Sequence, residues 1–401
     1  MYSDIAIAVD KSPCSHASET IGVEIAKQFH AAVSGYHVYS GRFHRARFGA
    51  LEPYLPPRYQ DEDQLDYQRR IHSVLIERGL EIISLEYMKG LSEKCAGEKI
   101  PLREVLKDGK NADILIEATR SHDLFIMGAQ GLGTVEGTRT LGGTASSVLR
   151  HAGCDLLIIR NDRIPRKVLV GIDGSEESFG AVKTGSGLAS MMNGEVTLIS
   201  VFNPQLHRTV FSLLSRVLSE EAGKVFRFNE QETLHNTIID RSLAELYRKY
   251  LDRGCEVARD SGCSRVNPVR KEGVPWNEIC REAEQGGYDL VVVSRSGMHK
   301  GSYSDIGSTA ERVVRNTGAN VLVVGGWAQI PGKIPSGEPA SVPCPAGGSL
   351  EWTEEASARI ENVPPFARSM AVLAIERYAR ELGVFIITPE IMDGAREKFG
   401  I

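Results

Sequence analysis

The stretch SRSGMHKGSYSDIGSTAERVVR, residues 294–315, follows the strand-forming run DLVVV and leads into a helical pattern. Gly297, Gly301 and Gly307 can adopt backbone conformations closed to other residues and let the main chain approach a ligand closely. Gly307 and Ser308 lie where a helix begins, so unpaired N–H groups and the positive end of the helix dipole would face outward. The spacing predicts an anion-binding loop at the end of a buried strand, with an ordinary flexible connection as the alternative.

Composition narrows the class of protein. The 401 residues predict two or three domains, and 42% hydrophobic with 25% charged residues is typical of a soluble globular chain. A net charge of −5 gives no electrostatic reason to expect nucleic acid or an anionic membrane as a partner. No uninterrupted apolar run approaches the ~18 residues of a membrane-spanning helix.

The cysteines indicate the redox environment. They are seven, an odd number, and none forms a CxxC pair, so we expect free thiols in a reducing compartment rather than a zinc, iron–sulfur or disulfide framework. The opening MYSDIAIAVDKSP has neither the basic nor the long apolar segment of a signal peptide. We therefore expect a cytoplasmic protein.

An internal repeat determines the architecture. IAIAVDKSP in the first half matches VLVGIDGSE in the second, with Asp10 opposite Asp173 at an offset of 163 residues. GGTASSVLR later matches GSTAERVVR, with Arg150 opposite Arg315 at an offset of 165. Landmarks that keep their order over this distance indicate two copies of one domain.

Within each copy, short apolar runs alternate with helical patterns. In the second copy we expect strands near 167–173, 195–201, 264–270, 289–293 and 320–324, and helices near 177–191, 231–253, 274–285 and 307–317. Continuous apolar strands such as KVLVGID predict burial on both faces. The fold class is therefore α/β: two tandem doubly wound, Rossmann-like parallel-sheet domains plus a small C-terminal helical domain, with ligands bound at the carboxyl ends of strands.

Four segments follow from these patterns. We expect domains at 1–162 and 163–326, a Pro/Gly-rich linker at 327–349 and a helical domain at 350–401. Each copy also carries an insertion after its second strand. GRFHRARFGALEPYLPPRYQDEDQ is interpreted as a solvated loop, with a lid or partner-binding arm as the alternative, and LHRTVFSLLSRVLSEEAGKVFRF as a packed helix.

The C-terminal segment shows helical order. Its apolar stripe comprises Ala371, Ile375, Tyr378 and Leu382. Gly383 ends that helix, and Thr388 with Pro389 begins another as cap and first-turn residue. A module of ~50 residues is near the lower limit for independent folding, so it is expected to pack on a partner.

The motifs resemble the universal stress protein family in its tandem form. Nucleotide-binding members carry an aspartate after the first strand and, near the end of the domain, G-x-x-G, nine residues, then G-S or G-T. In the second copy Asp173 matches the aspartate, while Ser294, Gly297, Gly307 and Ser308 match the rest with serine in place of the first glycine. The resemblance implies ATP or a related adenine nucleotide, with or without Mg²⁺, and an internal pseudo-dimer formed through DLLIIR and NVLVVG, with a homodimer as a further option.

The site expected in the second copy comprises Asp173, Val201, Val293, Ser294, Ser296, Gly297, Gly307, Ser308 and Thr309. Asp173 would accept hydrogen bonds from sugar hydroxyls, and the amides of 296–297 and 307–309 would face the phosphates. His299 and Lys300 could approach those phosphates or be solvated. Capping of the following helix is the alternative role for Asp10 and Asp173.

The first copy carries the weaker set Asp10, Gly128, Gly131, Gly142 and Thr144. Its spacer before Gly142 has ten residues, and Gly143 replaces the hydroxyl residue. Since one extra residue shifts a loop by up to ~3.5 Å, we expect binding in the second copy rather than the first.

Catalytic residues are not predicted. The sequence holds no G-x-x-x-x-G-K-[ST] loop and no recognisable nucleophile–histidine arrangement, and Asp305 is a single carboxylate that could assist Mg²⁺. A nucleotide-binding stress-response regulator or chaperone-like protein is therefore expected, contacting a protein partner through its insertions or C-terminal module. A nucleotide-free scaffold and a slow ATP hydrolase are the alternatives.

The tail is similar to a different family. WTEEA at its start, VPPFAR, and YARELG followed by ITPEIMDGAREKFG resemble the small C-terminal domain of the light-independent protochlorophyllide reductase B component. Nothing upstream resembles the body of that enzyme, and cluster-binding cysteines are lacking in the sequence. We expect an interaction module here and no reductase activity.

Overall fold

The computed structural model describes residues 2–134, 140–203, 240–298, 306–325 and 351–361, and, beyond these, 368, 371, 372, 375, 376, 378, 379, 382, 384 and 386–399. The chain divides into two compact units, Met1–Asn203 with Ala244–Gly332, and Pro204–Leu243 with Lys333–Ile401. The first unit contains both repeats except for 204–243 of the second, and is called the tandem body below.

The first repeat alternates strands and helices. Its elements are β1 (Asp4–Ala8), α1 (Pro13–Phe29), β2 (Ala32–Tyr39), α2 (Gly41–Leu51), η1 (Glu52–Tyr54), η2 (Pro57–Tyr59), α3 (Glu62–Gly97), β3 (Leu102–Asp108), α4 (Asn111–Ala118), β4 (Leu124–Gly128), α5 (Gly143–His151) and β5 (Asp155–Ile159). The strands coincide with apolar runs of the sequence, because their residues are buried in the sheet. Every residue of β5, for example, is buried.

The second repeat follows the same order. Its described elements are β6 (Lys167–Gly171), α6 (Glu176–Met191), β7 (Glu195–Phe202), α10 (Asp240–Asp260), β8 (Val266–Glu272), α11 (Pro275–Gly286), β9 (Leu290–Ser294), α12 (Ser308–Asn316) and β10 (Asn320–Val324). The predicted strands agree to within two residues. The helix predicted at 231–253 continues to Asp260, and its first residues lie outside the described ranges, as does the insertion at 206–228.

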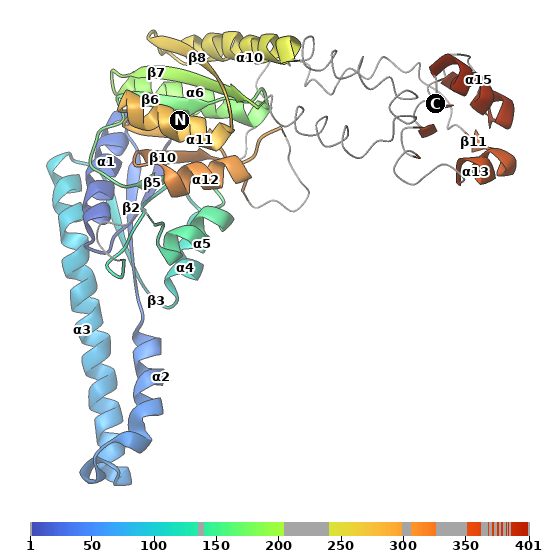
Figure 1. Ribbon diagram of the computed structural model, residues 1–401. Helices are drawn as coiled ribbons and strands as arrows, with labels where there is room; N and C mark the ends of the chain where they lie inside the picture. The colour runs from blue at the N-terminus through green and yellow to red at the C-terminus, as the bar shows by residue number, and fades with distance from the viewer. Residues whose placement is uncertain are drawn as a thin grey trace. The chain divides into compact units, whose positions relative to one another are not determined.

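The ten strands that the structure describes in the tandem body form one sheet, in the order β3-β2-β1-β4-β5-β10-β9-β6-β7-β8 (Figure 1). Neighbours are parallel within each repeat, and β5 pairs with β10 antiparallel, with Leu157 opposite Leu322. Helices α4, α5, α11 and α12 contribute to one apolar core cluster that contains residues of both repeats, among them Phe125 and Val291. The predicted α/β class with a doubly wound parallel sheet is confirmed.

Hydrogen bonds at the junction repeat across the pair β5–β10. Gly325 N donates to Asp155 Oδ1 at 2.9 Å, and Arg160 N donates to Asn320 Oδ1 at 2.8 Å. Asp155 and Asn320 are the first residues of their strands and both are buried. Each repeat therefore supplies one buried side-chain acceptor to the backbone of the other.

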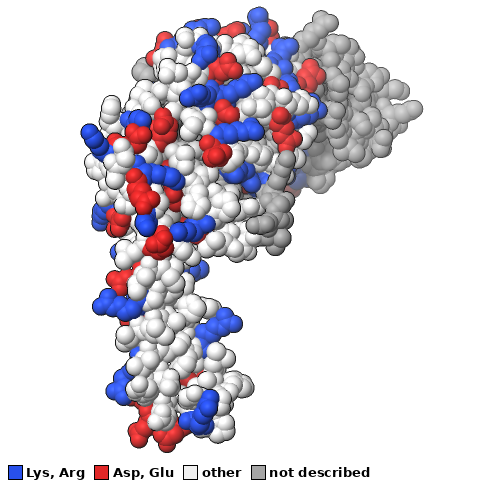
Figure 2. Space-filling model, turned by 90° about the vertical axis from the view of Figure 1, so that its left-hand side faces the viewer, with Lys and Arg blue, Asp and Glu red and all other residues white. Residues whose placement is uncertain are grey.

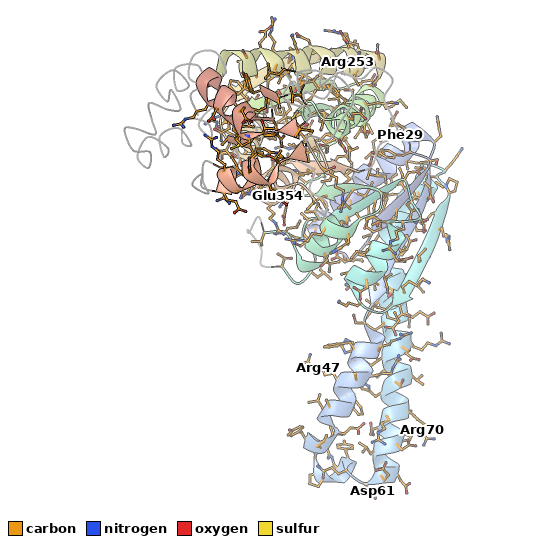
Figure 3. The ribbon with its side chains drawn as sticks, turned by 90° about the vertical axis from the view of Figure 1, so that its right-hand side faces the viewer. Phe29, Arg47, Asp61, Arg70, Arg253 and Glu354 are labelled. Atoms are coloured by element: carbon orange, nitrogen blue, oxygen red, sulfur yellow. The ribbon has the colours of Figure 1, made fainter. Side chains whose placement is uncertain are left out.

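The first insertion forms a helical hairpin, so the prediction of a solvated loop is wrong. Helix α2 leads out from the sheet and the 36-residue α3 returns (Figures 1 and 3). Asp61 caps α3 by accepting from Gln64 N at 3.4 Å, with acidic residues in the first turn. The prolines that suggested a loop occur only at the tip, at 53–57, where the chain reverses. We call α2, the tip and the projecting part of α3 the arm.

The C-terminal unit has a small core of its own. Helices α13 (Glu354–Glu361) and α15 (Pro389–Phe399) accompany two short parallel strands, β11 (Glu351–Trp352) and β12 (Ile386–Ile387), that were not predicted. Its buried residues are Ala356, Ile360, Ile375, Ala379, Ile387, Met392 and Ala395. Of the predicted stripe, Ala371, Ile375 and Tyr378 pack on this core, whereas Leu382 is 51% exposed and Gly383 lies outside the described residues. Pro389 begins α15 as expected, and Met392 N donates to Thr388 O at 3.1 Å.

Among the helices that the structure describes, none combines the length and apolar character needed to cross a bilayer.

Candidate functional site

A cavity of about 480 Å³ opens at the carboxyl ends of β1 and β4 in the first repeat. It is lined by all five residues predicted for this copy: Asp10, Gly128, Gly131, Gly142 and Thr144. The doubly wound topology predicts a ligand site at this edge of the sheet. The structure therefore brings the first-repeat set together around one space.

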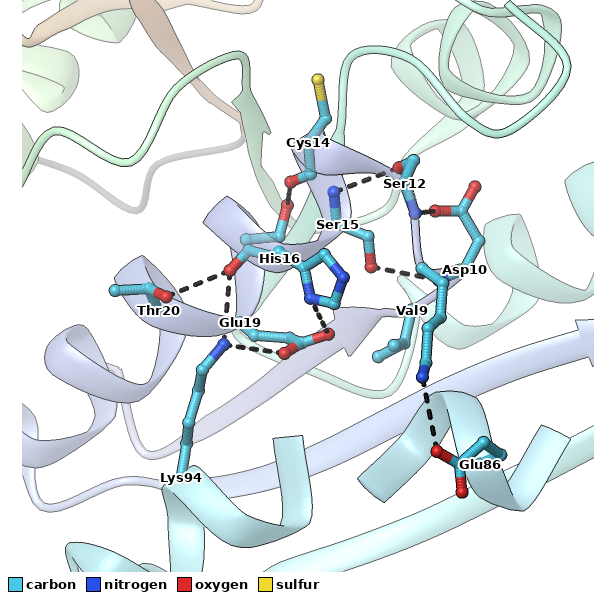
Figure 4. A network of polar contacts seen from close by, with 12 residues as sticks. Val9, Asp10, Ser12, Cys14, Ser15, His16, Glu19, Thr20, Glu86 and Lys94 are labelled. Carbon is cyan, nitrogen blue, oxygen red and sulfur yellow. Dashed lines mark hydrogen bonds and ion pairs between the residues drawn. The ribbon is translucent and has the colours of Figure 1, made fainter. Parts of the chain in front are cut away.

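Asp10 shapes the turn that follows β1. Ser12 N donates to Asp10 Oδ1 at 3.0 Å, and Asp10 N donates to Ser15 Oγ at 3.0 Å (Figure 4). The cap of α1 is Ser12, whose Oγ accepts from Ser15 N at 3.2 Å. Asp10 thus orders the turn through one carboxylate oxygen instead of capping the helix itself.

The other carboxylate oxygen of Asp10 faces Gly131. A β-carbon at Gly131 would lie 2.6 Å from Asp10 Oδ2, closer than real β-carbon contacts allow. A β-carbon at Gly128 would similarly lie 2.8 Å from Cys14 Cβ. Both glycines of this G-x-x-G segment are therefore required for the main chain to pass against the β1 turn.

The N-terminus of α5 forms another side of the cavity. Gly142 is its N-cap, without a side-chain capping bond, and 143–145 line the cavity. Gly142 N donates to Ala129 O at 2.8 Å, just as Gly307 N donates to Arg295 O at 2.7 Å in the second repeat. The expected displacement of Gly142 by the longer spacer does not occur, because this bond holds the start of α5 as the bond of Gly307 holds the start of α12.

The cavity residues that the sequence reasoning missed include His37, Tyr87 and Asn111. His37 Nδ1 lies 2.7 Å from Val9 O, and the His37 ring meets that of Tyr87 edge-on with centroids 5.0 Å apart. Tyr87 belongs to α3, which follows a segment that was interpreted as a loop. That interpretation could not predict that Tyr87 contacts β2. Its spacing of 163 residues from Tyr250 matches the repeat offset and could have revealed it.

The second-repeat residues occupy equivalent places. Asp173 accepts at Oδ1 from Ser175 N at 3.0 Å and Ser175 Oγ at 2.5 Å, and at Oδ2 from Met298 N at 3.0 Å. A β-carbon at Gly297 would lie 2.3 Å from Asp173 Oδ2. Both oxygens of this carboxylate are therefore engaged by the protein itself.

The remaining second-repeat predictions are placed as follows. Val201 and Val293 are buried, Ser294 and Ser296 are partly buried, and Gly307 is the N-cap of α12, which begins at Ser308 and Thr309. Gly301, His299, Lys300 and Asp305 fall outside the described residues.

An aromatic ring distinguishes the two repeats. Tyr250, the counterpart of Tyr87, is 2% exposed, and its ring packs on Gly174 so that a β-carbon there would lie 2.4 Å from Cζ. The first repeat has Lys11 at the position of Gly174, and Lys11 Nζ instead lies 3.5 Å from Glu86 Oε1. Burial, and secondarily the charge of Asp173, raises the pKa of Tyr250, so the ring stays neutral.

Within the ranges that the structure describes, no group of three or more His, Cys, Asp or Glu side chains is arranged to hold a metal ion. The polar side chains that line the first-repeat cavity are instead hydroxyls, side-chain amides, the imidazole of His37 and the carboxylate of Asp10. Such a set suits an organic ligand that carries both hydroxyl and anionic groups.

The two repeats, each a doubly wound Rossmann-like domain, define a tandem α/β protein. The family model "Universal stress protein family" matches residues 1–160 and 165–325. The chain belongs to the universal stress protein family, and both repeats are members.

Similar curated proteins carry the same family name. Universal stress protein MJ0531 of Methanocaldococcus jannaschii is 29% identical over 173 residues, covering 42% of this chain and 86% of its own length. Universal stress protein Rv1996 of Mycobacterium tuberculosis is 26% identical over 179 residues, or 43% of this chain. The match spans 55% of the length of that mycobacterial relative.

Solved structures also resemble the chain. A universal stress protein of Archaeoglobus fulgidus DSM 4304 covers 80% of this chain and 98% of its own, at 16% identity and a TM-score of 0.49. A universal stress protein solved in complex with cAMP covers 40% of this chain and 96% of its own, at 19% identity and a TM-score of 0.27.

The tail matches a second family model, "Proto-chlorophyllide reductase 57 kD subunit", over residues 352–396. The B component of light-independent protochlorophyllide reductase from Synechococcus is 42% identical over 55 residues, which are 14% of this chain and 11% of that protein. The resemblance expected from the sequence is confirmed for this segment.

Proposed function

We propose that this protein is a tandem stress-response regulator that binds an adenine nucleotide, ATP with or without Mg²⁺, in the cavity of the first repeat. The supporting observation is that Asp10, the Gly131 segment and the α5 N-terminus all line one cavity of about 480 Å³. That volume falls within the range of roughly 300–1,000 Å³ usual for small-molecule sites. Membership of a family whose nucleotide-binding motif the sequence resembles supports the class of ligand.

Each part of the nucleotide has a chemical counterpart in the cavity. The rings of His37 and Tyr87 offer an apolar surface for the base. Asp10 Oδ2 is placed to accept hydrogen bonds from ribose hydroxyls, and the α5 amides with the Thr144 hydroxyl suit the phosphates. Each exposed contact to a helix end contributes only ~0.3–1 kcal/mol, so micromolar affinity, about 8 kcal/mol, requires them together.

The second repeat is proposed as a weaker site, with the residue set given above from Asp173 to Thr309. Asp173 must exchange its bonds from Ser175 and Met298 for bonds to a ligand, and Tyr250 already covers Gly174. Because of these two costs we propose that the first repeat binds more tightly, although the second repeat carries the more complete motif.

The regulatory role concerns the rest of the chain. We propose that the repeats act as an intramolecular pseudo-dimer joined by β5 and β10, that the protein works in the cytoplasm, and that the C-terminal module docks a protein partner. No catalytic residue is assigned, and slow hydrolysis of bound ATP is the most that this site chemistry suggests.

Calorimetric titration with ATP tests the proposal on matched glycine variants. Gly131→Ala places a methyl group against Asp10 and should weaken binding at least about tenfold, about 1.4 kcal/mol. Gly297→Ala is the second-repeat equivalent and should leave the tighter binding phase unchanged. Gly97→Ala, where a β-carbon meets nothing within 4 Å, is the neutral control.

Two outcomes would reject the proposal. Absence of binding heat in the native chain would favour a nucleotide-free scaffold. Loss of the tighter phase in Gly297→Ala but not in Gly131→Ala would move the site to the second repeat.

A further inference from the structure

The arm carries an apolar stripe along α3. Its members are Tyr67, Ile71, Val74, Leu75, Ile82 and Leu85, each between 48% and 66% exposed. At about 100° per residue these positions fall on one side of the helix, where Arg78, paired with Glu81 at 3.0 Å, separates Leu75 from Ile82. We call this set the α3 stripe.

Helix α2 does not cover the α3 stripe. The contacts between α2 and α3 lie elsewhere on the helix, where Phe48 stacks on His72 with centroids 4.2 Å apart and Arg45 pairs with Glu77. At the root, the buried face of α3 presents Met88 and Leu91 to Gly35 of β2. Helix α3 thus packs against α2 on one face and against β2 at its root. The α3 stripe is not used in either contact.

The stripe has the size of an interface. Six side chains that each expose roughly 100 Å² present on the order of 600 Å² of apolar surface per chain. A standard interface buries about 800 Å² per partner, of which roughly two thirds is apolar at its core. One second copy of the same surface is therefore enough to form a stable contact.

Charges beside the stripe select the orientation of that second copy. Asp63 lies in the tip half of α3 and Lys89 in the root half. In a parallel pair each of these charges would meet itself, which is repulsive. In an antiparallel pair centred on Ile76, Asp63 meets Lys89.

The same register matches shape at the ends of the stripe. Near the root, Ile82, Leu85, Tyr87 and Lys89 line a surface groove of about 760 Å³. Tyr67, 53% exposed in the tip half, falls opposite Leu85 when the pair is centred on Ile76. The largest side chain of the stripe thus meets the hollow at the partner's root.

We propose that two copies of this protein dimerise through their arms, the α3 stripes packing antiparallel about a two-fold axis near Ile76. Within one chain, strands β5 and β10 already pair with each other and so join the two repeats. The arm therefore supplies an association surface separate from the sheet. This inference does not depend on nucleotide binding.

The oligomeric state of the full chain tests the proposal first. Light scattering at micromolar concentration should give twice the 43.9 kDa of one chain. Ile71→Glu with Val74→Glu buries carboxylates at the contact and should raise the dimer Kd by roughly a hundredfold or more. Phe43→Glu, at a position of α2 that is 61% exposed and lies outside both the α3 stripe and the groove, is the matched control and should remain dimeric.

Added cysteines then test the orientation. Under mild oxidation Leu75→Cys should form a dimer linked to itself, and a mixture of Tyr67→Cys with Leu85→Cys should form the mixed link, each identified by peptide mass spectrometry. Self-links at both 67 and 85 without the mixed link would indicate a parallel pair and overturn the register. A native chain that stays monomeric, or a dimer unaffected by the two glutamates, would overturn the proposal itself.

Discussion

The ring of Tyr250 packs directly on Gly174, and this contact separates two repeats that are otherwise closely alike. Gly174 has φ +90°, a conformation that Lys11 shares at 62° in the first repeat. The backbone is therefore the same kind of turn in both copies. What differs is whether an aromatic ring closes over it or a lysine side chain extends from it.

Replacing Gly174 with lysine should destabilise the second repeat. The first side-chain carbon would lie 2.4 Å from the Tyr250 ring, and overpacking of this kind costs typically 1–3 kcal/mol. We expect the free energy of unfolding in urea to fall by about 2 kcal/mol. The reciprocal change Lys11→Gly removes an exposed ion pair and should alter stability by less than about 1 kcal/mol, so equal losses in both variants would contradict the packing role.

Asp155 should make stability depend on pH. Burial raises its pKa to about 6, although the bonds from Tyr2 Oη and Gly325 N act in the opposite direction. The folded state therefore binds the proton of this carboxyl group more tightly than the unfolded chain, whose pKa is the usual 3.8. This adds to the free energy of unfolding fully below pH 3.8, and the added stability is lost as pH rises through about 6.

Asp155→Asn should therefore be more stable than the native chain at pH 8, by up to about 3 kcal/mol, with the difference vanishing near pH 4. Asparagine is the residue that the second repeat uses here, since Asn320 Oδ1 accepts from Arg160 N. Urea titrations across this pH range measure the difference. A constant gap at every pH would show that Asp155 has no such shift.

The root of the arm depends on one ion pair. Glu19 of α1 is 1% exposed, and Lys94 Nζ lies 2.8 Å from its Oε2 (Figure 4). Lys94→Ala leaves the buried carboxylate without its cation and should cost about 2 kcal/mol, a figure reduced because the lysine is partly solvated. In a double-mutant cycle measured by urea denaturation, adding Glu19→Gln to Lys94→Ala should recover part of the lost free energy of unfolding. If the losses of the two single variants simply add, the two side chains do not interact.

Charged side chains occur on both the tandem body and the arm. On the face drawn in Figure 2, basic and acidic residues are interspersed with uncharged ones over both parts. Figure 3 shows Arg47 and Arg70 on the arm and Asp61 at its tip.

Much of the fold was predictable because its signals are local. Nearly continuous apolar runs such as those of β5 and β9 mark strands buried on both faces, and the repeat offset fixed their order. The arm was missed because aromatic and proline content at its tip dominated the interpretation of the whole insertion. The two-residue strands β11 and β12 are too short to give a period-two pattern.

The parts of the site were predictable from the sequence, and the preference between the two repeats stays a prediction. Asp10, Gly131 and Gly142 meet as the motif implies, since each lies at the end of a strand or the start of a helix. The preference for the second copy rested on spacer length, yet the bond from Gly142 N to Ala129 O keeps the helix start in place. Tyr87 and Tyr250 contact segments that are distant in the sequence, so no local sequence pattern predicts these contacts.

Photolabelling with 8-azido-ATP tests the central claim, an adenine nucleotide in the first-repeat cavity, most directly. We predict labelling of peptides that contain His37 or Tyr87, protected by excess ATP and lost in Gly131→Ala. Labelling confined to peptides around Tyr250, or labelling that excess ATP does not reduce, would contradict the account.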